Sequence, residues 1–109
     1  MNAEEIRNYV LEKNYVTESF PFGDGVLVFK VNNKMFLLMS LNEETISFNV
    51  KCHPDKAVEL REEYPELILP GYHMNKMHWN TVFPVGLKNA LIIEMIDDSY
   101  DLVLKKKRK

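Results

Sequence analysis

The sequence predicts an α+β fold in which helices cover one face of an antiparallel sheet. Two observations lead to this class. Residues 26–51 show the two-residue alternation of strands, whereas the segments before and after them show helical spacing. The chain has 109 residues, enough for one domain whose core needs no disulfide. We therefore expect a two-layer sandwich over residues 1–104, followed by a basic tail at residues 105–109.

The N-terminal helix is predicted from its cap. Asn2 can accept a hydrogen bond from the backbone, and Glu5 lies three residues later, as in a capping box. Apolar residues follow at helical spacing, so we expect a helix over residues 3–13. The next segment, residues 16–24, has no helical period, and we predict an irregular turn flanked by aromatic side chains.

A hairpin is predicted in the next part of the chain. Two β-rich segments, Val26–Val31 and Lys34–Ser40, are joined by Asn32 and Asn33. Two asparagines tolerate the left-handed backbone that a two-residue hairpin turn requires. Such a turn determines how the strands pair. The pairs that we expect to face the core are Val31 with Lys34, Phe29 with Phe36, and Leu27 with Leu38.

The opposite layer of this hairpin is also apolar, except near the turn. Its predicted pairs are Lys30 with Met35, Val28 with Leu37, and Val26 with Met39. An antiparallel sheet with one wet face is normally polar on that face. Either loops cover this second face, or it forms an exposed patch that binds a partner.

The remaining regular elements follow from alternation and from proline. Ile46, Phe48 and Val50 alternate with polar residues and predict a third strand. Pro54 stands at the favoured first position of a second helix, on whose surface we expect Arg61 to pair with a carboxylate. After Gly86 the pattern is helical to the end of the chain, with Asp98 marking a point where a kink is allowed.

Residues 70–82 hold two of the three histidines and the single tryptophan. A Pro-Gly turn precedes aromatic and β-branched residues, which predicts a strand over residues 77–82. Alternation sends Trp79 to one face, and His78 and Asn80 to the other. We predict that Trp79 is buried, and that His78 or Asn80 reaches a cleft or makes a specific hydrogen bond.

The charge of the chain is unevenly distributed. The net charge is −2, and five of the fourteen basic residues are the last five of the chain. Residues 1–104 therefore carry nine basic against sixteen acidic residues, a net charge of −7. Because an acidic body repels phosphate, any affinity for DNA should be weak and salt-dependent.

Several classes of protein are disfavoured by what the sequence lacks. No apolar run reaches the roughly 20 residues that span a bilayer, and the N-terminus lacks the features of a signal peptide. A single cysteine suits a reducing cytoplasm. His73 and His78 should lie on opposite faces of a strand, which disfavours zinc, and neither a phosphate-binding glycine loop nor a nucleophile elbow is present. We expect a cytoplasmic protein without catalytic residues, cofactor or metal.

The segment that begins at Gly71, Gly-Tyr-His-Met-Asn-Lys-x-His-Trp-Asn-Thr-Val, resembles the signature of the YjbR/MmcQ family of small bacterial proteins. Other pieces match in order. They are Ser19-Phe-Pro-Phe-Gly23, Val28-Phe-Lys-Val31 with Lys34-Met-Phe36, Lys51-Cys-His-Pro54 with Leu60-Arg61, and Ser99-Tyr-Asp-Leu-Val103. The resemblance implies a frataxin-type, CyaY-like sandwich and a DNA-binding role.

Following this resemblance, we expect a non-enzymatic binding protein whose first candidate partner is DNA. The candidate contacts are Lys30, Lys34, Lys51, Lys76, His78 and Asn80. Two alternatives stay open. One is a protein-interaction module that uses the apolar second face of the hairpin. The other is a pocket for a small planar ligand, formed by Phe20, Phe22, Tyr72, His73 and Trp79.

Overall fold

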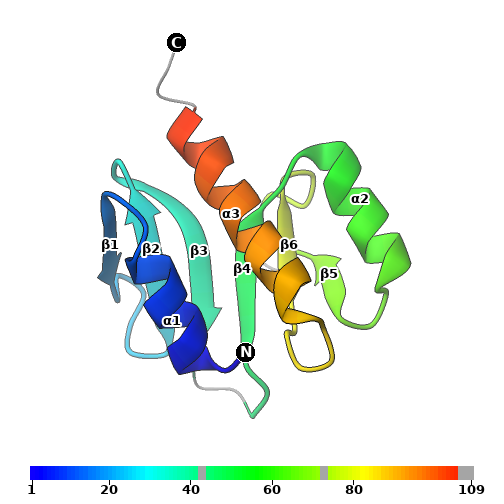
Figure 1. Cartoon of the computed structure of the whole chain (residues 1–109), viewed down its shortest axis with the longest axis horizontal. Helices are drawn as coiled ribbons and strands as arrows, with labels where there is room; N and C mark the ends of the chain where they lie inside the picture. Colours follow the sequence, from blue (N-terminus) through cyan, green and yellow to red (C-terminus); the bar gives the residue numbers. More distant parts are fainter. Residues whose placement is uncertain (42–43, 72–73, 106–109) are drawn as a thin grey trace.

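The computed structural model describes residues 1–41, 44–71 and 74–105, which form three helices and one six-stranded antiparallel sheet (Figure 1). The helices are α1 (Ala3–Leu11), α2 (Pro54–Glu63) and α3 (Asn89–Lys105). The strands are β1 (Val16–Ser19), β2 (Val26–Val31), β3 (Lys34–Ser40), β4 (Ser47–Lys51), β5 (Ile68–Pro70) and β6 (Trp79–Val82). Their order across the sheet is β1-β2-β3-β4-β6-β5. The predicted α+β class is confirmed.

The helices and the sheet enclose the main core. Figure 1 shows α1 and α3 lying across one face of the sheet, with α2 beside β5 and β6. Side chains from all three helices, among them Ile6, Leu60 and Ile96, pack in one cluster with the strands. We call the opposite side of the sheet the open face, because α1 and α3 leave it uncovered.

The helix α1 begins as predicted. The Asn2 side chain accepts a hydrogen bond from the Glu5 backbone N–H at 2.8 Å, and the Glu5 carboxylate accepts from the Asn2 N–H at 2.9 Å. The helix ends at Leu11, two residues before the predicted end, and Tyr15 then takes a left-handed backbone with φ of 67°. This turn directs the chain back along the sheet edge.

The strand β1 is absent from the sequence-based prediction, which expected irregular structure there. It is four residues long, and it exists because it pairs antiparallel with β2, with Val16 opposite Val31. Glu18 of β1 accepts two hydrogen bonds from the Arg7 guanidinium of α1, at 2.8 and 2.5 Å. A short edge strand of this kind has no strong local signal, so only its partner reveals it.

The predicted Asn32-Asn33 turn is confirmed, with φ of 52° and 68° at the two asparagines. The predicted pairing is correct only next to the turn. A β-bulge shifts the register between Phe29 and Lys30, so that Phe29 lies opposite Leu37 rather than Phe36. The pairs that follow are Val28 with Leu38, Leu27 with Met39, and Val26 with Ser40. The predicted pairs of Phe29 with Phe36, Leu27 with Leu38, Val28 with Leu37 and Val26 with Met39 are therefore wrong.

The bulge has a physical cause in the packing of α3. Phe36 is the extra residue, and its ring meets the Tyr100 ring edge to face, with centroids 5.5 Å apart. Phe36 and its neighbour Leu37 both join the core under the helices, which strict alternation forbids. Leu38 consequently turns to the open face, where it packs with Val28 and Trp79.

The last predicted elements are largely confirmed. The strand β4 buries Phe48 and Val50 under the helices, and α2 starts with Pro54 after the capping residue His53. The helix α3 continues unbroken through Asp98 for 17 residues. It ends at Lys105, and the other residues of the predicted basic tail lie outside the described ranges.

Candidate ligand-binding cavity on the open face of the sheet

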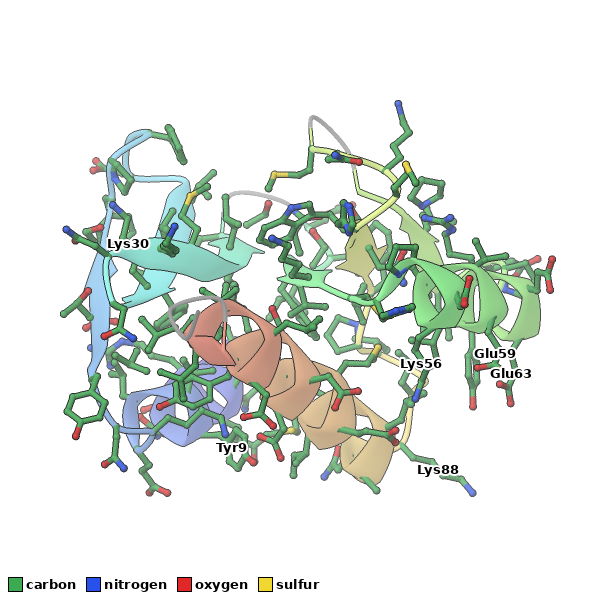
Figure 2. All side chains as sticks on the ribbon, turned by 90° about the horizontal axis from the view of Figure 1, so that it is seen from above. Tyr9, Lys30, Lys56, Glu59, Glu63 and Lys88 are labelled. Atoms are coloured by element: carbon green, nitrogen blue, oxygen red, sulfur yellow. The ribbon has the colours of Figure 1, made fainter. Side chains whose placement is uncertain are left out.

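The open face carries a cavity of about 840 Å³. Figure 2 shows two connections rising from the sheet on the side away from α1 and α3: residues 20–25, and the end of the chain segment that leads from β5 to β6. The cavity lies between side chains of these connections and the strands. Its lining consists of Phe22, Val26, Met35, Leu38, Ser40, Ser47, Asn49, Leu69, Pro70, Met74, Thr81 and Phe83.

The floor of the cavity is set by the strand register. Ser40 of β3 lies directly opposite Ser47 of β4. One row further along, Leu38, Asn49, Thr81 and Leu69 follow one another across β3, β4, β6 and β5. The polar side chains therefore gather in the middle of the floor, with apolar side chains at both ends.

The polar groups of the floor are only partly used within the protein. The Thr81 hydroxyl donates a hydrogen bond to the Asn49 side-chain oxygen. Across the described residues, the Ser40 and Ser47 hydroxyls and the Asn49 side-chain nitrogen make no hydrogen bond, although Ser47 is only 5% exposed. These three groups are free to bind a molecule in the cavity.

The walls of the cavity are formed by apolar side chains, several of which are exposed to solvent. Phe22, at the tip of the β1–β2 connection, is 63% exposed, and Leu69 on β5 is also exposed. Met74 stands on the opposite connection and packs against the cluster that contains Trp79. Exposed apolar side chains around a hollow are typical of binding sites.

Trp79 belongs to the apolar cluster against which Met74 of the cavity wall packs. It is buried as predicted, with 8% of its surface exposed. Gly71 crosses it closely, and its N–H donates to the Trp79 carbonyl at 2.8 Å. A Cβ atom at Gly71 would lie 2.7 Å from the Trp79 Cβ. Only glycine therefore allows this approach of the two segments.

Asn80 points away from the cavity, under α2. It is 1% exposed, its side-chain nitrogen donates to the Ala57 carbonyl at 3.4 Å, and its oxygen accepts from Arg61 at 3.1 Å. Arg61 also donates to the Lys76 carbonyl at 2.9 Å. The predicted specific hydrogen bond of Asn80 is thus present, whereas the expected pairing of Arg61 with a carboxylate is replaced by this contact. The burial of Asn80 removes it from the set of surface residues that could touch DNA.

The other predicted DNA contacts are divided in space. Lys51 lies opposite Trp79, and Lys30 lies opposite Met35. Because Trp79 and Met35 pack on the open face, the two lysines also lie on that face. Lys34 is exposed beside the hairpin turn, and Lys76 is exposed in the β5–β6 connection. His78 lies half-buried just before β6, where its carbonyl accepts a hydrogen bond from the Cys52 N–H at 2.6 Å.

The predicted planar-ligand pocket is brought together only in part. Phe22 lines the cavity, and Trp79 lies in the apolar cluster of the open face. Phe20 instead lines a separate hollow of about 540 Å³ beside α1, which it shares with Arg7 and Glu18. Tyr72 and His73 lie outside the described residues.

The polar floor was missed at the level of sequence. Ser47 and Asn49 appear there only as the wet side of an alternating strand. Thr81 is 32 residues from Asn49, and the pairing of β4 with β6 is what brings the two together. The one available signal was the apolar second layer of the hairpin, which indicated a cover or a binding surface.

Neither a metal site nor a membrane-spanning helix is found among the described residues. There, no group of three or more His, Cys, Asp or Glu side chains is arranged to hold a metal ion, and no helix is long and apolar enough to cross a membrane. Burial, followed by the nearby Asp98 carboxylate, raises the pKa of the Cys52 thiol to about 11. The thiol therefore keeps its proton at neutral pH.

These features define a small α+β protein with a six-stranded antiparallel sheet that carries a cavity on its open face. The chain belongs to the YjbR family, whose family model matches residues 11–102. Among curated relatives, YbdF of Escherichia coli O157:H7 is 38% identical over 102 residues, which cover 93% of this chain and 83% of YbdF. YjbR of Escherichia coli K12 is 28% identical over 114 residues, covering 100% and 96% of the two chains. Both are named as uncharacterised proteins, so their names carry no activity over to this chain.

Two crystal structures are similar to the whole fold. Deinococcus radiodurans protein DR2400, with a DUF419 domain, superposes with a TM-score of 0.92 at 36% identity, over 99% of this chain and 82% of that one. A protein from Pseudomonas syringae superposes with a TM-score of 0.78 at 26% identity, over 94% and 99% of the two chains.

Proposed function

We propose that this protein binds a small organic ligand in the open-face cavity and catalyses no reaction on it. One observation carries the proposal: the apolar hollow of about 840 Å³ has three polar groups on its floor without a hydrogen-bond partner among the described residues. Ligand sites typically enclose about 300–1,000 Å³ and combine apolar walls with a few placed polar groups.

The chemistry of the lining supports binding rather than catalysis. Within the described residues, the lining contains no side chain that gains or loses a proton near neutral pH. General acid–base catalysis needs such a group within reach of the substrate. Cys52 packs in the core on the helix side, and its raised pKa keeps it a poor nucleophile.

Amide NMR spectra of ¹⁵N-labelled protein, recorded with a library of small fragments, test the proposal. We expect fragments that bind to shift the amide signals of Ser47, Asn49 and Thr81. Ser40→Phe fills the floor with an aromatic ring and should abolish these shifts. Thr17→Phe, at an exposed strand position outside the lining, is the matched control. Fragment shifts that persist in Ser40→Phe would place binding elsewhere and overturn the proposal.

A second candidate function, weak DNA binding, is favoured by the lysines of the same face. Lys30 and Lys51 are directed there by their strand partners, and phosphate contacts of this kind position a protein without reading base sequence. The family resemblance that suggests DNA binding also suggests a frataxin-type sandwich. The packing of the helices on one face of the sheet supports this proposed likeness to frataxin. We also propose a cytoplasmic location, because a free cysteine such as Cys52 is typical of proteins in a reducing compartment.

A further inference from the structure

We infer that the ligand of the open-face cavity is a neutral ring compound with an amide-type edge, that is, a carbonyl beside an N–H group. The inference rests on the proposed function and adds the chemical class of the ligand. It follows from three properties of the cavity: the absence of charge in its described lining, the free polar groups on its floor, and the side chains of its walls.

The lining selects against charge. Over the described residues, the cavity is bordered by apolar side chains and by four neutral polar ones, Ser40, Ser47, Asn49 and Thr81. A carboxylate or phosphate that left water here would have no charged partner in this lining, and burying an unpaired charge is far more costly than burying a neutral polar group. Lys30 and Lys51 belong to the same face but do not border the cavity.

The floor offers a donor beside hydroxyl groups. The Asn49 oxygen accepts from Thr81, which leaves the NH₂ group of Asn49 to donate to a ligand. Ser47 lies two residues from Asn49 on β4, roughly 7 Å along the strand, and Ser40 is directly across from Ser47, with Cβ atoms about 5 Å apart. A ligand carbonyl can accept from Asn49 while its neighbouring N–H donates to a serine hydroxyl.

The walls suit a flat apolar body. Phe22 and Phe83 supply ring faces, and Met35 and Met74 supply flexible thioethers that pack well against aromatic rings. A ring compound can therefore set its polar edge on the floor and its apolar surface against the walls.

Three bicyclic probes of similar size separate the possibilities. 2-Quinolinone has a neutral amide edge, naphthalene-2-carboxylate has an anionic edge, and naphthalene has no polar edge. Titrations followed by amide NMR should give 2-quinolinone an affinity at least tenfold higher than either other probe, with the shifts centred on Ser47, Asn49 and Thr81. Tightest binding of the carboxylate, or equal binding of naphthalene, would overturn the inference while leaving a ligand-binding cavity. Binding of none of the probes, together with no hit from the fragment library, would overturn the proposed function itself.

Two variants test the polar floor directly. Asn49→Leu keeps the shape of the side chain and should reduce 2-quinolinone binding to the level of naphthalene, without weakening naphthalene. Asn8→Leu, an exposed position on α1, is the matched control. If Asn49→Leu fails to give a folded spectrum, Ser47→Ala carries the test, and we expect a three- to tenfold loss for 2-quinolinone alone. Unchanged affinity in a folded floor variant would contradict the role of these groups.

Discussion

The hydroxyl of Ser99 links α3 to two neighbouring strands of the sheet. It is 0% exposed on α3, its hydroxyl donates to the Phe36 carbonyl at 2.6 Å, and it accepts from the Lys51 N–H at 2.8 Å. The pairing of β3 with β4 runs from Ser40 with Ser47 to Leu37 with Val50, and Ser99 bridges the two strands just beyond it. The hydroxyl thus takes the place of a strand-to-strand hydrogen bond and ties α3 to the sheet.

Ser99→Ala should lower the free energy of unfolding by about 2–4 kcal/mol, because each buried backbone group left without its partner costs about 1–3 kcal/mol. Urea unfolding measures the loss. Asp101→Ala, at an exposed position of the same helix, is the control and should change stability by less than about 0.5 kcal/mol. If both variants were equally stable, the hydroxyl bridge between β3 and β4 would make no contribution to stability.

Cys52 makes the stability of the protein depend on pH in the alkaline range. Burial raises the pKa of its thiol from 9.0 to about 11 in the folded state. The folded protein therefore holds this proton more tightly than the unfolded chain, and the resulting stability is present below pH 9 and lost as the pH rises to 11. The shift corresponds to on the order of 2 kcal/mol.

We expect Cys52→Ala to flatten the alkaline decline in the free energy of unfolding, measured by urea unfolding between pH 8 and pH 11. Burial also raises the pKa of Tyr9, to about 12, but this phenol is present in both proteins. The difference in slope therefore isolates the thiol. Parallel curves for the two proteins would show that Cys52 titrates normally in the folded state.

At the scale of elements, α2 holds the wall of the cavity in place. Arg61 reaches from α2 to the Lys76 carbonyl in the β5–β6 connection and to Asn80 in β6. On the other side of this connection, Gly71 lies against Trp79. Contacts from two directions therefore hold the wall: Arg61 on one side, and Gly71 against Trp79 on the other.

Arg61→Met keeps the length of the side chain but removes both hydrogen bonds, so the connection should open more often. We expect the amides of His78 and Trp79, which donate to the Asn75 carbonyl, to exchange hydrogen about tenfold faster, since a hydrogen bond to a charged group contributes about 1.5–3 kcal/mol. Hydrogen–deuterium exchange detected by NMR measures this. Glu62→Met, the exposed neighbour, should leave these rates unchanged; equal rates in Arg61→Met would show that the wall does not depend on α2.

At the scale of the whole molecule, the charge distribution limits nucleic-acid binding. The body over residues 1–104 has a net charge of −7, while residues 105–109 are all basic. Two lysines already form ion pairs within the protein: Lys13 with Asp97 at 2.6 Å, and Lys56 with Glu94 at 3.0 Å. Among the described residues, these two ion pairs make Lys13 and Lys56 less available to neutralise phosphate.

If the protein binds duplex DNA, the logarithm of the binding constant should fall with the logarithm of the salt concentration with a slope of roughly −3 to −5, at micromolar or weaker affinity. Fluorescence anisotropy over a salt series measures both quantities. Deleting residues 105–109 should remove at least half of the binding, because they form the densest positive run. The triple variant Lys30→Gln, Lys34→Gln, Lys76→Gln tests the folded surface separately.

Nanomolar affinity of the tailless protein at 150 mM salt would contradict this charge argument, and the hairpin would then have to contact bases or a groove. Absence of binding in both forms would remove DNA as a partner and leave the ligand cavity as the functional site.

Local sequence determined the features that depend on neighbouring residues. The capping box of Asn2 and Glu5, the left-handed turn at Asn32 and Asn33, and the start of α2 at Pro54 each involve contacts within three residues. Alternation also correctly sent Trp79 and Asn80 to opposite faces, because side-chain direction in a strand is a property of the backbone. The family resemblance and the apolar second face of the hairpin were likewise readable from the chain alone.

Only the tertiary structure decided the features that depend on residues far apart in the chain. The register of the hairpin shifts because Phe36 packs on Tyr100, and Ser99, more than sixty residues after Phe36, takes the place of a hydrogen bond between β3 and β4. The polar floor exists because β6 pairs with β4, which brings Thr81 to Asn49. Side-chain patterns report which face a residue prefers, but packing between distant segments determines which residues share that face.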